Sequence, residues 1–205
     1  MEFGREAYSR SRIKVTRWYD ALAERYDELY GEEQRRKFKL AEVKGKGVVL
    51  DCGCGTGLLL ANLSPGPMTV GLDLSEKMLR QAKKRLGSGV HLVQGDALTP
   101  PFKASAFDTV YSFTVIEPER CETFIKAISG LLREGGMVVL SALKKSFNPQ
   151  ILRSLTEASG LTPVDVMDVE GVKDYVVVCF KRNGWKSPPK PCLSSPCPKH
   201  RQRGR

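Results

Sequence analysis

The segment DCGCGTG, residues 51 to 57, carries the clearest chemical signal in this chain. Asp51 ends the apolar run GVVLD, and Gly53, Gly55 and Gly57 follow at alternate positions. Glycine has no Cβ, so a ligand can approach the backbone closely, and a strand leading through glycines into a helix predicts free backbone N–H groups there. The pattern matches neither the G-x-G-x-x-G of dinucleotide sites nor the Gly-Lys-Ser/Thr of the P-loop. A carboxylate in this loop favours a ligand with an ammonium group over a pyrophosphate.

Two further aspartates end the next two apolar runs. Asp73 stands in VGLDLS and Asp96 in VQGDA. Because the carboxyl ends of parallel strands meet at one edge of a sheet, where open α/β folds bind ligands, we expect all three acids along one rim. Asp73 is placed to accept hydrogen bonds from both hydroxyls of a ribose. Together the three acids indicate a nucleoside ligand that also carries a cationic amino-acid end.

The elements that must position these residues are short apolar runs alternating with stretches long enough for helices. This alternation predicts a mostly parallel sheet with helices on both faces. Strands are expected over 47–50, 68–74, 90–96, 107–113 and 136–143. The runs 162–169 and 174–182 are separated only by EGVK, so they are expected to form an antiparallel hairpin. The predicted fold class is α/β, Rossmann-like, with seven strands and a reversed last strand.

Two of the intervening helices have clear end signals. Ser75 is the expected N-cap of SEKMLRQAKKRLG, which closes at Gly87. Asn148 caps NPQILRSLTEASG, with Pro149 at the first helical position and Gly160 just past the end. These residue types at these positions are typical helix boundaries.

The ends of the chain differ in character from its body. Residues 1–14 are predicted to be a flexible basic N-terminus, and residues 183–205 a disordered basic tail. A helix is expected from Val15 to Leu40, with a break near Gly31.

The net charge of +10 is concentrated at the two ends of the chain. Residues 183–205 carry +6 and residues 1–17 carry +3, which leaves the body near neutral. The polar N-terminus and the lack of a membrane-length apolar run predict a cytoplasmic protein.

The motifs, in this order, resemble those of class I S-adenosylmethionine-dependent methyltransferases. VVLDCGCGTG resembles the first motif of that family, GLDLS its ribose-binding acid, QGDA its adenine-binding segment and FDTVYSF its fourth motif. The resemblance covers about residues 19–182, so the region 15–182 is identified as a methyltransferase domain with an N-terminal lid helix. The segment YDALAERYDELY further resembles the opening helix of the ubiquinone and menaquinone biosynthesis (type 11) group.

The resemblance implies S-adenosylmethionine as cofactor, S-adenosylhomocysteine as product and no metal requirement. It places Asp51 and the loop backbone at the methionine portion, Asp73 at the ribose, Met78 at the adenine face, and Asp96 with Ala97 at the adenine edge. Tyr19 and Tyr26 are expected either to close the pocket or to pack the helix down. The residues expected to bind cofactor are Tyr19, Tyr26, Asp51, Cys52, Gly53, Gly55, Gly57, Asp73, Leu74, Met78, Asp96, Ala97 and Ser112.

On the acceptor side the signals are weaker. The Asn/Asp-Pro-Pro-aromatic motif of amino-directed enzymes is absent, because SFTV stands in its place. Glu117 is a candidate general base, with a solvated loop residue as the alternative. Cys121 lacks the context of a nucleophile and is expected to be a buried structural thiol. Cys192, Cys197 and His200 supply only three ligands, whereas structural zinc needs four.

Three functions therefore stay open. The opening helix favours a small-molecule acceptor. Because no lid is inserted between the fifth and sixth strands, an open mouth would also suit RNA, held by the basic ends or by a partner subunit that completes the site. A subunit that binds the cofactor without catalysis is the third possibility. In the first two cases, methyl transfer would be an in-line displacement, in which the protein aligns the two reactants and excludes water.

Overall fold

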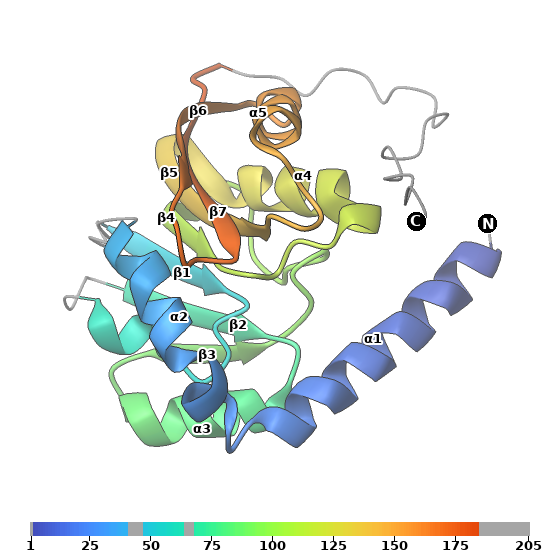
Figure 1. Cartoon of the computed structure of the whole chain (residues 1–205), viewed down its shortest axis with the longest axis vertical. Helices are drawn as coiled ribbons and strands as arrows, with labels where there is room; N and C mark the ends of the chain where they lie inside the picture. The colour runs from blue at the N-terminus through green and yellow to red at the C-terminus, as the bar shows by residue number, and fades with distance from the viewer. Residues whose placement is uncertain (1, 41–46, 64–67, 185–205) are drawn as a thin grey trace.

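The computed structural model describes residues 2–40, 47–63 and 68–184, and it contains a seven-stranded sheet (Figure 1). The strands are β1 (Val48–Cys52), β2 (Met68–Asp73), β3 (His91–Gln94), β4 (Phe107–Ser112), β5 (Leu132–Leu143), β6 (Leu161–Asp168) and β7 (Asp174–Lys181). Their order across the sheet is β3-β2-β1-β4-β5-β7-β6. All pairs from β3 to β5 are parallel, whereas β7 is antiparallel to both β5 and β6. The predicted fold class and reversed last strand are confirmed.

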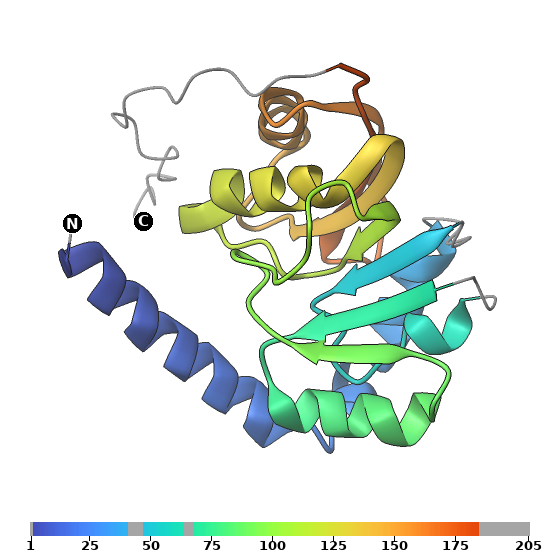
Figure 2. The same cartoon turned by 180° about the vertical axis from the view of Figure 1, so that it is seen from behind.

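Helices cover both faces of the sheet, as predicted (Figures 1 and 2). Leu50 and Cys52 of β1 face a core shared with α4 (Cys121–Leu131) and α5 (Pro149–Ala158). Val49, between them, faces a smaller core on the other side, which includes Phe38 of α2. This alternation follows from the two-residue period of side chains along a strand.

The predicted helix boundaries are confirmed at α3 (Glu76–Leu86) and α5. The Ser75 side chain accepts a hydrogen bond from the backbone of Met78, and Asn148 accepts one from Ile151. The glycines at the other ends, Gly87 and Gly160, have φ values of 64° and 78°. Glycine adopts this left-handed conformation without the steric cost that a Cβ would bring.

The N-terminal region differs from the prediction. Two helices are present, α1 (Glu2–Leu22) and α2 (Tyr26–Leu40). The chain therefore turns at residues 23–25, where Ala23 is buried, and the break predicted at Gly31 is wrong. One glycine costs a helix only about 1 kcal/mol, which is too little to end it. Residues 2–14, expected to be flexible, lie in α1, and they contain no proline that would interrupt a helix.

The helix predicted after the glycine loop is also not an α-helix. Among the described residues between the loop and β2, which end at residue 63, the only helical element is a 3₁₀ turn, Leu60–Asn62. Residues 58–67 are all that separate Gly57 from β2, and two of them, Pro65 and Pro67, cannot sit in a helix interior. Across the described residues, no helix is both long enough and apolar enough to cross a membrane.

Candidate functional site

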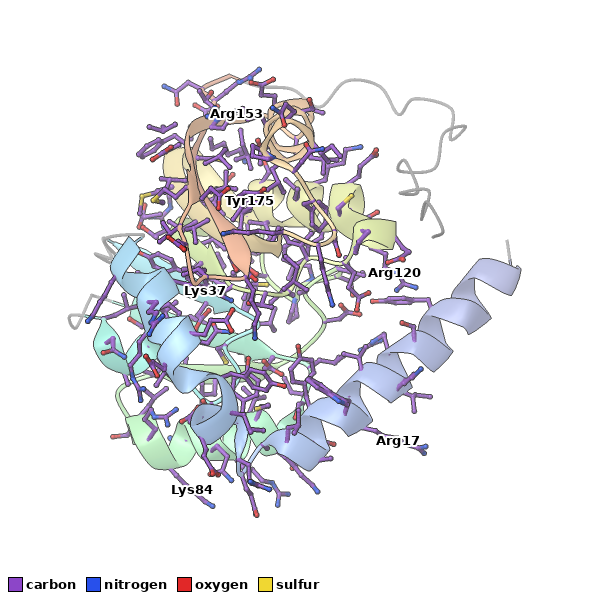
Figure 3. The ribbon with its side chains drawn as sticks, viewed as in Figure 1. Arg17, Lys37, Lys84, Arg120, Arg153 and Tyr175 are labelled. Atoms are coloured by element: carbon purple, nitrogen blue, oxygen red, sulfur yellow. The ribbon has the colours of Figure 1, made fainter. Side chains whose placement is uncertain are left out.

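A cavity of about 550 Å³ lies at the carboxyl ends of the strands, beneath α1 and α2. Residues from the ends of β2, β3 and β4 line it, together with the glycine loop and the start of β7. Arg120 lies between the body of the protein and α1 (Figure 3). The predicted site residues that line the cavity are Tyr19, Tyr26, Gly53, Gly55, Asp73, Leu74, Met78, Asp96, Ala97 and Glu117. Those that do not are Asp51, Cys52, Gly57 and Ser112.

The three loop glycines have positive φ values but different surroundings. A Cβ built on Gly53 would come within 2.3 Å of Val115, and one on Gly57 within 2.8 Å of Leu86. A Cβ on Gly55 would meet no atom within 4 Å. Gly53 and Gly57 are therefore required by packing, whereas Gly55 leaves open space that a ligand can use.

The backbone amides at the start of the loop are already hydrogen bonded. Gly53 and Cys54 both donate to the carbonyl of Leu72, at 2.7 and 3.0 Å. Gly55 donates to Asp73 Oδ2 at 2.8 Å. The prediction that the loop presents free N–H groups is wrong for these three amides, because the end of β2 supplies acceptors for them.

Asp73 holds the loop in place while lining the cavity. Its Oδ2 accepts from Gly55, and its Oδ1 accepts from the backbone of Ser75 at 2.9 Å. Burial raises the pKa of Asp73, and hydrogen bonds from Ser75 and Gly55 oppose this shift. Each carboxylate oxygen can accept a second hydrogen bond. The group therefore retains the capacity to bind two ribose hydroxyls.

Asp51 lies beneath the cavity rather than on its wall, with 3% exposure. Burial, and next the negative charge of Asp73, raise the pKa of Asp51 to about 8. A cationic group nearby would favour its ionised form. Ser112 donates to the carbonyl of Cys52 at 2.8 Å and is fully buried, so its hydroxyl joins β4 to β1. Burial raises the pKa of the Cys52 thiol.

Both N-terminal helices are attached beside the glycine loop. Asp20 of α1 accepts a hydrogen bond of 2.5 Å from the Ser75 hydroxyl at the start of α3. Asp27 of α2 accepts one of 2.6 Å from Thr56 and forms an ion pair with Arg85 of α3. These contacts position α1 and α2 as the cover of the cavity.

An aromatic row from the two helices forms part of the cavity wall. Ring centroids lie 4.8 Å apart for Trp18 and Tyr19, 6.3 Å for Tyr19 and Tyr26, and 5.1 Å for Tyr26 and Tyr30. Burial raises the pKa of Tyr19 to about 12 and also raises the pKa of Tyr26. Tyr19 and Tyr26 thus pack against their neighbours and line the cavity at the same time.

Asp96 is bound by α1, a contact that sequence reasoning missed. Its Oδ2 lies 3.0 Å from Arg12 Nε and accepts a hydrogen bond from the Tyr8 hydroxyl. The backbone of Leu98 donates to its Oδ1 at 2.9 Å. The guanidinium of Arg120 lies 4.1 Å from the Tyr8 ring centroid. No motif marked Tyr8 or Arg12, because residues 1–14 were expected to lie outside the folded part.

A buried polar cluster between α2 and the sheet was missed as well. Lys37 and Asp174 are each 1% exposed, and Lys37 Nζ lies 2.8 Å from Asp174 Oδ2. Thr114 and Ser141 donate to the same oxygen at 2.9 and 2.6 Å. Lys37 stands among charged residues of α2, where a lysine is expected to be exposed. Only the position of Thr114 directly after the fourth motif connected this cluster with the site.

The remaining candidates occupy different environments. Glu117 is exposed and lines the cavity. Cys121 is 2% exposed and packs in the larger core, as expected of a structural thiol. Within the described ranges no cluster of three potential metal ligands occurs. Cys192, Cys197 and His200 lie outside the described residues.

Comparisons with known proteins agree with this geometry. A family model described as "Methyltransferase domain" matches residues 49–136. An uncharacterized methyltransferase of Geobacillus sp. is 30% identical over 179 residues, which cover 82% of this chain and 84% of the relative. A demethylmenaquinone methyltransferase of Staphylococcus aureus is 32% identical over 62% of this chain. The chain spans 58% of that relative's length, and 53% of an uncharacterized Methanocaldococcus jannaschii protein.

Solved structures share the fold at low sequence identity. The magnesium protoporphyrin IX methyltransferase of Synechocystis, solved with bound S-adenosylmethionine, has a TM-score of 0.64 and 19% identity, covering 83% of this chain and 96% of that one. A methyltransferase of Haloferax volcanii, solved in complex with the Trm112 methyltransferase activator, has a TM-score of 0.61 and 16% identity over 80% of this chain and 97% of that one.

Proposed function

This chain belongs to the class I S-adenosylmethionine-dependent methyltransferases, and we propose that it methylates a small molecule bound in the cavity beneath α1 and α2. The observation that carries this proposal is the cavity itself. Its volume of about 550 Å³ falls within the range of small-molecule sites, roughly 300–1,000 Å³. Aromatic side chains line it, and two helices cover the side that the sequence suggested was open.

The residues at the ends of β1, β2 and β3 fit the cofactor. We assign Asp73 to the ribose hydroxyls, Met78 to the adenine face, and Asp96 with Ala97 to the adenine edge. Asp51 provides negative charge beneath the site for the ammonium of the methionine portion. The open space at Gly55 is where the ligand can approach the backbone.

When bound, S-adenosylmethionine supplies a methyl group that is already strongly electrophilic. The protein then has to align the acceptor with this methyl group and exclude water. The aromatic row at Tyr19 and Tyr26 serves both purposes in this proposal. Glu117, on the exposed rim, stays a candidate general base.

RNA is the second candidate acceptor, and the charge distribution favours it. Residues 183–205 carry a net charge of +6, and Lys14 and Arg17 are exposed on α1. Figure 3 shows Arg17 pointing away from the body of the protein. Such charges bind phosphates without reading sequence. A partner subunit belongs to this alternative, since the Haloferax volcanii methyltransferase was solved with an activator protein.

Transfer of radiolabelled methyl from S-adenosylmethionine into unfractionated cell extract tests the proposal. The products are sorted by nuclease treatment, protease treatment and size. We expect label in small organic molecules. Label in a nuclease-sensitive macromolecular fraction would support the RNA alternative, and cofactor binding without any transfer would support a non-catalytic subunit.

Gly55→Val is the variant that should abolish activity in this assay. A side chain at this position would project into the space assigned to the cofactor. Valine at a φ of 52° also strains the loop, by about 1–3 kcal/mol, which should leave the domain folded. We expect the variant to lose both cofactor binding and methyl transfer. Undiminished cofactor affinity would show that the site lies elsewhere.

A further inference from the structure

Lys37 and Asp174 form a buried ion pair whose hydrogen-bonding capacity is not filled. Lys37 Nζ donates to Asp174 Oδ2 and to Thr114 Oγ1, each at 2.8 Å. An ammonium group has three N–H donors, and Glu33 Oε1, at 3.6 Å, is too far for a hydrogen bond of normal geometry. One donor of Lys37 is therefore left over within the described part of the chain.

The two oxygens of Asp174 are in opposite states. Oδ2 accepts three hydrogen bonds, from Lys37, Thr114 and Ser141. Oδ1 is buried and accepts none from any described residue. A buried carboxylate oxygen without a partner is costly, and native proteins nearly always supply one. The pair thus offers one unused acceptor and one unused donor.

The position of the pair identifies which reactant it serves. Lys37, Thr114 and Asp174 all line the cavity. They come from α2, the end of β4 and the start of β7, whereas the residues assigned to the cofactor come from the ends of β1, β2 and β3 and from the start of α3. Since β4 and β5 separate β1 from β7 in the sheet, the pair lies toward the opposite end of the row of strands.

The backbone conformation of Thr114 supports a binding site here. Its φ of 61° is in the left-handed region, which a β-branched residue rarely adopts. The Ser141 hydroxyl accepts a hydrogen bond from the Thr114 amide at 2.9 Å and holds this conformation. In return the Thr114 hydroxyl reaches both Lys37 and Asp174.

We propose that Lys37 and Asp174 bind a neutral hydroxyl group of the acceptor, and that Asp174 takes up its proton as the oxygen is methylated. A hydroxyl donates one hydrogen bond and accepts another, which matches the two unused groups. A carboxylate has no proton to donate, and a protonated amine would be repelled by Lys37. The inference rests on the proposed methyltransferase function and deepens it.

Methylation of the hydroxyl breaks two bonds, the O–H bond of the acceptor and the carbon–sulfur bond of the cofactor. The O–H bond breaks and its proton moves to Asp174 Oδ1, while the oxygen forms the new bond to the methyl carbon. The electrons of the broken carbon–sulfur bond remain on the sulfur of S-adenosylhomocysteine. The product is a methyl ether, and Asp174 returns its proton to solvent when the product leaves.

The first test identifies the atom of the product that carries the new methyl group. Wild-type protein is incubated with ¹³C-methyl S-adenosylmethionine and cell extract, and the labelled products are identified by NMR and mass spectrometry. We expect the label on oxygen. Label on nitrogen or carbon would overturn this inference while leaving the methyltransferase function intact, whereas no transfer at all would refute the proposed function itself.

Asp174→Asn separates proton uptake from a structural role. We expect the transfer rate to fall by about 10²-fold at neutral pH while affinity for S-adenosylhomocysteine stays within about twofold. The residual rate should rise about tenfold per pH unit, because the hydroxyl must then ionise without help from a protein base.

Lys37→Met tests the other half of the pair and should raise KM for the acceptor. Asp168→Asn, which removes an exposed carboxylate paired with Lys144, is the control and should behave as wild type. A pH profile of Asp174→Asn identical to that of the wild type would contradict the inference.

Discussion

Asp73 links the glycine loop to the proposed ribose site. Its carboxylate holds the Gly55 amide and the start of α3, and it lines the cavity. Sequence position alone predicted the ribose contact, but it did not predict that the same carboxylate would organise the loop. A single residue therefore connects local backbone structure with ligand binding.

Replacing Asp73 by alanine should weaken cofactor binding by about 1.5–3 kcal/mol. The loss comes from charge-assisted hydrogen bonds to the ribose. Isothermal titration with S-adenosylhomocysteine measures the change. Asp165→Ala, at an exposed position of β6, is the control. An unchanged dissociation constant for Asp73→Ala would mean that the ribose is bound elsewhere.

Asp51 should make the stability of the ligand-free protein depend on pH. Its pKa in the folded state, about 8, lies above the ordinary value of 3.8. The folded chain keeps this proton where the unfolded chain has released it, so stability falls as the pH rises from 3.8 toward 8. Asp51→Asn removes the cost of burying an ionisable carboxylate. It should raise the free energy of unfolding at pH 8 by at least about 1 kcal/mol. Urea denaturation at pH 5 and pH 8 measures it, and an equal effect at both pH values would contradict the assignment.

At the scale of elements, the glycine loop divides its roles between neighbouring residues. Gly57 allows α3 to pack closely, and Gly55 faces open space. The sequence predicted a glycine-rich ligand loop without distinguishing these roles, because spacing along the chain does not reveal which glycine a neighbouring helix will approach. The N-terminal helices α1 and α2 show the same limit. Their helical residues were largely predictable, but the turn at residues 23–25 depends on how α1 and α2 pack.

Gly57→Ala should destabilise the protein by about 1–3 kcal/mol. The new methyl group would lie 2.8 Å from Leu86 and 3.1 Å from Ala82, at a φ of 75°. Thermal denaturation measures the loss. Gly130→Ala is the matched control, because a Cβ there would meet no atom within 4 Å, and alanine favours the helix. Equal melting temperatures for the two variants would refute the packing role of Gly57.

Asp20→Ala should loosen α1 without unfolding the domain. The substitution removes the hydrogen bond from Ser75 that joins α1 to α3. We expect faster amide hydrogen exchange in residues 11–22 and unchanged exchange in β1, β4 and β5. Glu24→Ala, in the turn between the helices, is the control at an exposed acid. Unchanged exchange in α1 would mean that other contacts hold this helix against the body of the protein.

For the whole molecule, the mostly parallel seven-stranded sheet with its reversed last strand and the helices on both faces followed from periodicity and motif order. The expected rim of three aspartates was right for Asp73 and Asp96, which line the cavity, but not for Asp51, which is buried beneath it. The polar cluster of Lys37 and Asp174 could not be predicted, because its members lie far apart in the chain and only the insertion of β7 beside β5 brings them together. The binding of Asp96 by α1 was likewise hidden, since it depends on the direction in which a long helix leaves the body (Figure 1). Tertiary contacts, rather than local pattern, decide both.

Removing residues 185–205 should leave methyl transfer to a small molecule unchanged. These residues contribute charge but supply no residue assigned to the site. The transfer rate of the shortened chain is compared with that of the full chain at low and high salt. A loss of activity that also varies strongly with salt would favour RNA as the acceptor.

A crystal structure with S-adenosylhomocysteine tests the central claim most directly. The account predicts that the ligand fills the cavity beneath α1 and α2, with both ribose hydroxyls within hydrogen-bond distance of Asp73 and the adenine beside Met78. Its sulfur should face the end of the cavity that holds Lys37 and Asp174. A ligand bound outside this cavity, or one whose ribose makes no contact with Asp73, would contradict the account.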